Sequence, residues 1–69
     1  MDRIQVTSSD LRSVGYEEET QTLEIEFNSG SVYRYANVPP HEYEGLINAS
    51  SKGKYFHANI KNAYSCTKL

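Results

Sequence analysis

Hydrophobic and polar residues alternate most clearly between Thr22 and Phe27. A pattern of period two predicts a β-strand with one buried face and one solvated face. The hydrophobic face would carry Leu23, Ile25 and Phe27, and the polar face would carry Thr22, Glu24 and Glu26. This segment is therefore the strand on which the rest of the predicted sheet is built.

An earlier strand is predicted over residues 11–16, in which Val14 and Tyr16 share one face. Gly15 between them indicates either a β-bulge or the close approach of another part of the backbone. Further upstream, residues 4–6 have two hydrophobic side chains separated by a polar one. That short pattern predicts only an extended lead-in to the sheet.

The loop of residues 28–30 ends on Gly30, as in a three-residue hairpin whose last loop residue takes the left-handed conformation. Such a loop pairs Ile25 with Tyr33, so that Tyr33 and Tyr35 lie on the hydrophobic face. A loop of two or four residues would turn both tyrosines to the solvated face, because a one-residue shift in register exchanges the faces. The glycine position and the gain in hydrophobic contacts favour the first register, with the third strand spanning residues 31–36.

Pro39 and Pro40 end the sheet, since proline has no N–H to donate to a neighbouring strand. Proline suits the first turn of a helix, so residues 40–48 are predicted to be helical. The buried side of this helix would carry Tyr43, Leu46 and Ile47. Its weak point is Gly45, which costs roughly 1 kcal/mol relative to alanine.

A second helix is predicted after a serine cap at Ser50 or Ser51, running to about Asn62. Its buried side would carry residues spaced by four, namely Phe56, Ile60 and Tyr64.

Together these elements predict an α+β fold: a three-stranded antiparallel β-meander followed by two short α-helices packed on one sheet face. The chain is interpreted as a single domain of residues 1–69, with an ordered core from about residue 6 to 64. We expect its hydrophobic cluster to contain Phe27, Leu46, Ile47, Phe56 and Ile60.

Composition adds limits on location and charge. Cys66 is the only cysteine, so no disulfide can form within the chain, and a reducing compartment is favoured. No segment resembles a signal sequence or a membrane span, so we expect a cytoplasmic protein. The net charge of −2 is unevenly distributed. Residues 1–35 carry seven acidic and three basic side chains, whereas residues 36–69 carry four basic and two acidic ones.

The segment Ser51-Lys52-Gly53-Lys54 is the best candidate for anion binding. A helix N-terminus offers free N–H groups, and glycine lets a phosphate approach the backbone. The alternative is an ordinary serine cap with two solvated lysines. The segment is no phosphate loop, because the second glycine and the following hydroxyl residue of that motif are missing.

The triplet Tyr33-Arg34-Tyr35 offers a second interpretation as a stacking platform for bases, since both rings share a face. The register argued above favours a structural role, with both rings under the helices. Arg34 would then lie on the open face and pair with Glu24 and Glu26.

No metal site, cofactor site or catalytic site is predicted. His41, His57 and Cys66 lack the spacing of a metal-binding motif, and the sequence indicates no positioned catalytic partner for either histidine. Ser8 and Ser9 suit a turn or a cap. We therefore expect a binding module and no enzyme.

An ordered set of residues carries a family resemblance over most of the chain, roughly residues 6 to 64. These residues are Ser8-Ser9, Val14-Gly15-Tyr16, Leu23-x-Ile25-x-Phe27, Gly30, Tyr33-Arg34-Tyr35, Val38-Pro39, Tyr43, Ala49-x-Ser51-x-Gly53-Lys54-x-Phe56, Ile60 and Tyr64. The set resembles the KTSC domain, a small module named for the C-terminus of certain lysyl-tRNA synthetases. The family also includes free-standing bacterial and phage proteins, and the whole-chain match implies such a stand-alone form here. The synthetase context implies RNA binding.

The leading hypothesis is a module that contacts an RNA phosphate backbone or a tRNA-like element through residues 51–61. Charge would come from Lys52, Lys54 and Lys61, backbone access from Gly53, and a ring that stacks or packs from Tyr55. The alternative is a protein-interaction module that uses the Glu-rich open sheet face or an exposed strand edge.

Overall fold

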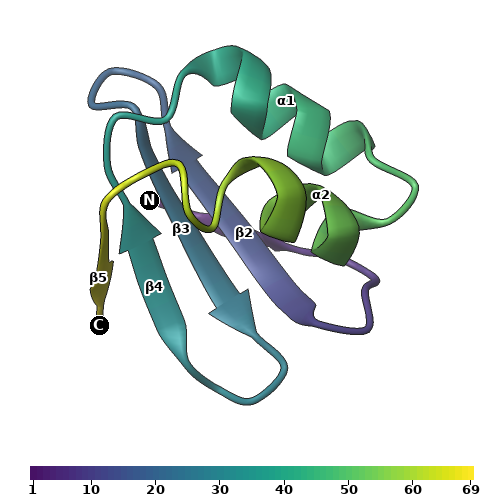
Figure 1. The fold of residues 1–69 in the computed structure, drawn as a ribbon. Helices are drawn as coiled ribbons and strands as arrows, with labels where there is room; N and C mark the ends of the chain where they lie inside the picture. Colours follow the sequence, from purple (N-terminus) through teal and green to yellow (C-terminus); the bar gives the residue numbers. More distant parts are fainter.

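The computed structural model describes residues 1–69 as one antiparallel sheet with two helices packed on it (Figure 1). The five strands lie side by side in chain order, and both helices come between the fourth and fifth strands. The elements are β1 (Arg3–Gln5), β2 (Leu11–Glu17), β3 (Thr22–Phe27), β4 (Val32–Tyr35), α1 (Pro40–Asn48), α2 (Lys52–Asn59) and β5 (Cys66–Lys68). Neither helix has the length and hydrophobicity that crossing a membrane requires.

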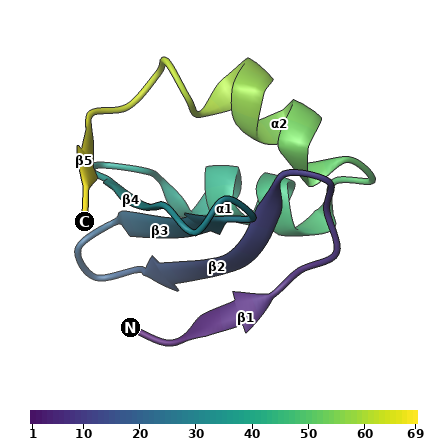
Figure 2. The same cartoon turned by 90° about the horizontal axis from the view of Figure 1, so that it is seen from below.

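The α+β class and the two packed helices are confirmed, but the predicted three-stranded sheet is wrong, because the sheet has five strands. The two additional strands are the edges, β1 and β5, and Figure 2 shows β1 on the far side of β2 from α2. Each edge strand has only three residues, all of them exposed. The short alternation of residues 4–6 predicted only an extended segment there and residues 66–68 gave no signal, so each edge strand is held mainly by the hydrogen bonds of its neighbouring strand.

The hairpin between β3 and β4 has the predicted register. Ile25 pairs with Tyr33, and the N–H of Phe27 donates to the carbonyl of Ser31 at 2.9 Å. Gly30 has φ +97°, in the left-handed region where glycine is favoured. The three-residue loop thus puts both tyrosines of β4 on the hydrophobic face.

Strand β2 contains a bulge that the sequence did not locate. The register shifts between Leu11 and Ser13, so that Leu11 and Val14 both reach the hydrophobic face although they are three residues apart. Gly15 lies outside this bulge, and of the two predicted explanations for this glycine, the close approach of another part of the backbone is the one observed. A Cβ there would lie 2.9 Å from Cγ of Arg3, whose strand runs alongside.

The first helix has the predicted limits, while the second is three residues shorter than expected. Ser51 caps α2, its Oγ accepting a hydrogen bond from the N–H of Lys54 at 3.4 Å. At the other end, the N–H groups of Ile60 and Lys61 both donate to the carbonyl of Phe56. The helix ends at Asn59, and the chain then turns back to pair Cys66 with Tyr35.

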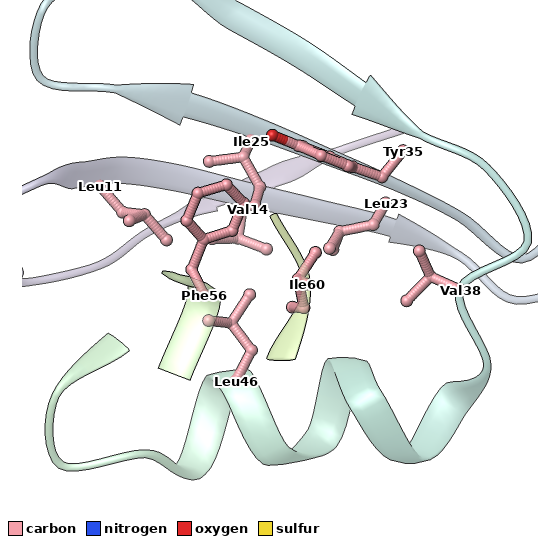
Figure 3. Packing of buried hydrophobic residues seen from close by; sticks show 9 residues of the cluster. All are labelled: Leu11, Val14, Leu23, Ile25, Tyr35, Val38, Leu46, Phe56 and Ile60. Atoms are coloured by element: carbon pink, nitrogen blue, oxygen red, sulfur yellow. The ribbon is translucent and has the colours of Figure 1, made fainter. Parts of the chain in front are cut away.

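The core lies between the helices and the sheet (Figure 3). Of the predicted cluster, Leu46, Phe56 and Ile60 are buried, and Phe27 and Ile47 are half-buried against them. The full buried cluster is Leu11, Val14, Leu23, Ile25, Tyr35, Val38, Leu46, Phe56 and Ile60. These side chains come from β2, β3, β4, the loop before α1 and the two helices, so one cluster holds both layers together.

Candidate functional site

The N-terminus of α2 borders a shallow groove of about 720 Å³, here called the α2 groove. It is lined by Ser9, Asp10, Ser51, Gly53, Lys54, His57 and Ala58. Gly53 is buried, and a Cβ there would lie 3.5 Å from Cβ of Asp10, within ordinary contact. Lys54 is exposed and lines the groove.

A carboxylate enters this groove from the loop before β2. Oδ2 of Asp10 lies 2.9 Å from Nε2 of His57, and both side chains are about half exposed. The two residues are 47 positions apart, so no local pattern could have indicated their contact. Because Asp10 adds negative charge at the start of α2, the groove is a weaker anion site than Lys54 and Gly53 alone would make it.

Two residues of the predicted site are engaged elsewhere. The ammonium of Lys52 donates to the carbonyl of Ala49 at 3.2 Å, and Lys52 does not line the α2 groove. The hydroxyl of Tyr55 donates to Oε1 of Glu42 at 2.7 Å, which links the two helices. This hydrogen bond, together with burial, raises the pKa of Tyr55 to about 12. The ring of Tyr55 was predicted either to stack on a base or to pack within the domain, and its position between the helices corresponds to packing.

A second depression, of about 520 Å³, lies between α2 and the β3–β4 hairpin. We call it the aromatic hollow. Its hydrophobic lining is Phe27, Tyr33, Tyr35, Phe56 and Cys66, and its polar lining is Asp10, Ser29, Ser31, His57, Lys61 and Asn62. The hollow therefore brings the tyrosines of β4 next to Lys61, two parts of the predicted site that lie far apart in sequence.

The rings of the aromatic hollow form a chain of edge-to-face contacts. Phe27 contacts Tyr33 with centroids 5.8 Å apart and Phe56 with centroids 5.3 Å apart, while Phe56 contacts Tyr35 at 5.6 Å. Tyr35 is buried, and this burial raises its pKa to about 12. Tyr33 is only half-buried. The pair faces the helices, as its register predicts, yet the ring of Tyr33 stays partly accessible.

Two lysines and a histidine lie along α2 and the turn that follows it. Lys54 and His57 are three residues apart on α2, so they share one side of the helix, and Lys61 follows just beyond the helix end and lines the aromatic hollow with His57. His57 and Asp10 line both the α2 groove and the aromatic hollow, so the two depressions adjoin each other.

The open face of the sheet is less acidic than its glutamates suggest. Glu24 accepts hydrogen bonds from Arg3 at 3.0 Å and from Arg34 at 3.1 Å. Glu26 lies 3.8 Å from Arg12. The predicted pairing of Arg34 with Glu24 is confirmed, but its predicted pairing with Glu26 is not found, because Arg12 pairs with Glu26 instead. Arg3 reaches the same face from β1. The alternative hypothesis of a Glu-rich surface therefore loses most of its negative charge.

Metal-binding residues do not gather in the fold. No group of three or more His, Cys, Asp or Glu side chains is placed to hold a metal ion.

Comparison with known proteins places the chain in a family. The sequence model of the KTSC domain matches residues 7–64. An uncharacterized protein of Stutzerimonas stutzeri is 48% identical over 61 residues, covering 88% of this chain and 86% of that protein. A lysine–tRNA ligase of Nostoc punctiforme is 49% identical over 59 residues, covering 86% of this chain but only 10% of the ligase.

A solved structure supports the same assignment. A KTSC domain protein from Yersinia pestis superposes with a TM-score of 0.96 at 35% identity, covering 99% of this chain and 96% of that one. Fold and sequence agree over nearly the whole length, and the chain belongs to the KTSC domain family.

Proposed function

We propose that this domain binds single-stranded RNA or an unpaired region of a tRNA through the aromatic hollow and the exposed side of α2. The observation that carries the proposal is the placement of Lys61 and the accessible ring of Tyr33 around one hollow. A base stacked on an aromatic side chain contributes about 1–3 kcal/mol, and a neighbouring lysine neutralises the adjoining phosphate.

The relatives support an RNA partner. A segment of 59 residues that is homologous to this chain occurs inside lysine–tRNA ligases of Nostoc and Trichormus. The names of these ligases state that they act on tRNA. This chain spans 10% of the length of those ligases, so their catalytic activity is not part of the proposal.

The charges predict weak binding. Lys54 and Lys61 are exposed on the proposed surface, whereas Lys52 is bound to the carbonyl of Ala49, just after α1, and the carboxylate of Asp10 opposes the lysines. Two neutralised phosphates on a single strand give a slope of about −1.4 in a plot of log affinity against log salt concentration. The domain would therefore serve as an auxiliary contact, with modest affinity and moderate salt dependence.

The test is a titration with bulk tRNA and with an oligouridylate at low and high salt, followed through backbone amide signals. We expect saturable shifts at Tyr33, His57 and Lys61 that weaken as salt rises. Lys61→Ala and Tyr33→Ala should each reduce the affinity, and Lys52→Ala is the matched control because it removes an equal charge outside the hollow. Equal losses in Lys52→Ala and Lys61→Ala would contradict a specific surface, and no shift at low salt would contradict RNA binding.

The competing proposal is a protein partner that adds a strand to the sheet. Its support is that β1 and β5 are the sheet's two edges and that all of their residues are exposed. Absence of RNA-induced shifts would favour this proposal.

A further inference from the structure

A third depression lies on the open face of the sheet, away from the helices. It has a volume of about 580 Å³ and is called the sheet-face hollow here. Arg3, Glu24 and Arg34 line one side of it, and residues 29–32 and 68–69 line the other. Glu24 and Arg34 alternate along their strands with core residues such as Ile25 and Tyr35, so their side chains lie on the opposite face from the core.

A single row of paired residues builds the charged side of this hollow. Arg3 pairs with Gly15, Gly15 with Glu24, and Glu24 with Arg34. The missing side chain at Gly15 leaves the space through which Arg3 reaches Glu24, since a Cβ there would lie 2.9 Å from Cγ of Arg3. Gly15 is thus required for a row of paired residues that crosses four neighbouring strands, β1 to β4, and carries the charge cluster.

The cluster holds two guanidinium groups at one carboxylate. Nη1 of Arg3 lies 3.0 Å from Oε1 of Glu24, and Nη2 of Arg34 lies 3.1 Å from Oε2. Each guanidinium makes this one hydrogen bond within the protein, although it carries five N–H donors in a planar fork. Most donors of both groups therefore remain free.

The two arginine side chains of the cluster are more exposed than its carboxylate, as the binding of an anion from solvent requires. The side chain of Glu24 is only 12% exposed, whereas that of Arg3 is 33% exposed and that of Arg34 is 51% exposed. The carboxylate is shielded and the two guanidinium groups face solvent, with one positive charge in excess. On the same face, the Arg12–Glu26 pair is neutral as a unit and offers a comparison.

We propose that the Arg3–Glu24–Arg34 cluster binds a phosphoryl group in the sheet-face hollow. A guanidinium fork matches the oxygen spacing of phosphate, and two forks held by one shielded carboxylate are already positioned when the anion arrives. Glu24 and Gly15 act as positioning residues, and Arg3 and Arg34 contact the ligand. Its arginines lie on the opposite face of the sheet from the aromatic hollow, and the two hollows share only Ser29 and Ser31 of the hairpin loop.

The test follows the Nε–Hε signals of the arginines while inorganic phosphate is added at low ionic strength. We expect saturable shifts at Arg3 and Arg34, and no saturable shift at Arg12. Arg34→Gln should weaken phosphate binding about tenfold or more, because it removes charge-assisted hydrogen bonds. Arg12→Gln is the matched control and should change the affinity less than about twofold.

A second variant separates binding from folding. Arg34→Lys keeps the charge beside Glu24 but loses the planar fork, so it should retain the wild-type melting temperature while binding phosphate more weakly. If neither Arg3 nor Arg34 responds to phosphate, or if Arg12→Gln loses as much affinity as Arg34→Gln, the proposal is overturned.

The source of the phosphoryl group is resolved by comparing two probes at the same signals. Tighter binding of uridine monophosphate would indicate a phosphorylated small molecule, and tighter binding of a dinucleoside monophosphate would indicate a nucleic-acid backbone. An oligoglutamate peptide that outcompetes both would overturn the phosphoryl assignment. Shifts at Lys61 report on the aromatic hollow separately, so the two proposals can fail independently.

Discussion

The ring of Tyr55 on α2 lies directly over Gly45 on α1. A Cβ at Gly45 would lie 2.5 Å from Cζ of Tyr55 and closer still to its hydroxyl oxygen. The same hydroxyl donates to Glu42 one turn earlier on α1. The glycine that weakens α1 as an isolated helix is therefore what allows the two helices to pack closely.

Gly45→Ala should destabilise the domain, although alanine is the better helix former. Helix propensity alone would add about 1 kcal/mol to the free energy of unfolding. The clash with Tyr55 forces a shift of packed groups, and such overpacking costs about 1–3 kcal/mol. We expect a net loss of stability in urea unfolding.

A double-mutant cycle isolates this contact. In a Tyr55→Ala background the space above residue 45 is free, so Gly45→Ala should stabilise the protein by about 1 kcal/mol. The same effect of Gly45→Ala in both backgrounds would show that the two residues are not coupled.

Gly30→Ala tests the backbone of the β3–β4 hairpin. No atom lies within 4 Å of the position that a Cβ would take, so only the positive φ of +97° opposes the substitution. We expect a loss of about 1–2 kcal/mol in the free energy of unfolding. Gly30→Asn should lose less, because asparagine tolerates this region better, and Ser29→Ala on the exposed loop should stay within about 0.5 kcal/mol of wild type.

The parts of the fold that the sequence predicted are those with a strong local signal. The alternation in β3 and the position of Gly30 were enough to derive the pairing of Ile25 with Tyr33. The prolines and the hydrophobic spacing located α1. In contrast, β5 carries no pattern and the two hydrophobic residues at 4 and 6 indicated only an extended segment near β1, because exposed three-residue edge strands obtain their conformation from a partner.

The candidate sites were harder to predict, because their contacts join distant parts of the chain. Asp10 meets His57, and Arg3 reaches Glu24 only because β1 pairs with β2. The lysines of residues 51–61 were visible as a local cluster. The hydrogen bond from Lys52 to the carbonyl of Ala49 depends on where α1 ends and how the chain turns there. A pattern of charges in the sequence does not indicate that geometry.

Phe56→Ala should remove most of the stability of the domain. Phe56 is 2% exposed and contacts the rings of Phe27 and Tyr35, so its removal opens a cavity at the centre of the core. Replacing a buried phenylalanine with alanine costs about 3–5 kcal/mol, and small domains have a total of about 5–15 kcal/mol. Thermal unfolding should therefore begin at a much lower temperature.

The control for this substitution is Lys54→Ala, on the exposed side of the same helix, which should stay within about 0.5 kcal/mol of wild type. A Phe56→Ala protein that melts cooperatively near the wild-type temperature would contradict the core described above.

Glu42 accepts hydrogen bonds from two tyrosines, and we expect these bonds to make the free energy of unfolding depend on pH in the alkaline range. It accepts hydrogen bonds from Tyr55 at 2.7 Å and from Tyr64 at 3.0 Å. The hydrogen bond to Glu42 and burial raise the pKa of Tyr55 from 10.0 to about 12, and burial with the same carboxylate raises the pKa of Tyr64. In both cases the folded protein favours the neutral phenol.

The upward shift of the tyrosine pKa values determines whether stability rises or falls with pH. A group whose pKa is higher in the folded state stabilises the protein fully below its unfolded pKa, and the contribution is lost as the pH rises through the folded value. The free energy of unfolding should therefore be insensitive to these tyrosines up to about pH 10 and should fall between about pH 10 and pH 12. Tyr35 adds to the decline, because burial raises its pKa to about 12 as well.

Two variants identify the contribution of Glu42. Tyr55→Phe should lower the stability at neutral pH by about 1 kcal/mol, through loss of one hydrogen bond, and should make the alkaline decline shallower. Glu42→Gln removes the negative charge, so the pKa of Tyr55 should move back toward 10.0. Urea unfolding from pH 7 to 12 measures the stability, and tyrosinate absorbance measures the ionisation. A titration in which Glu42→Gln leaves the tyrosinate curve unchanged would show that burial alone, without the carboxylate, sets the pKa of both tyrosines.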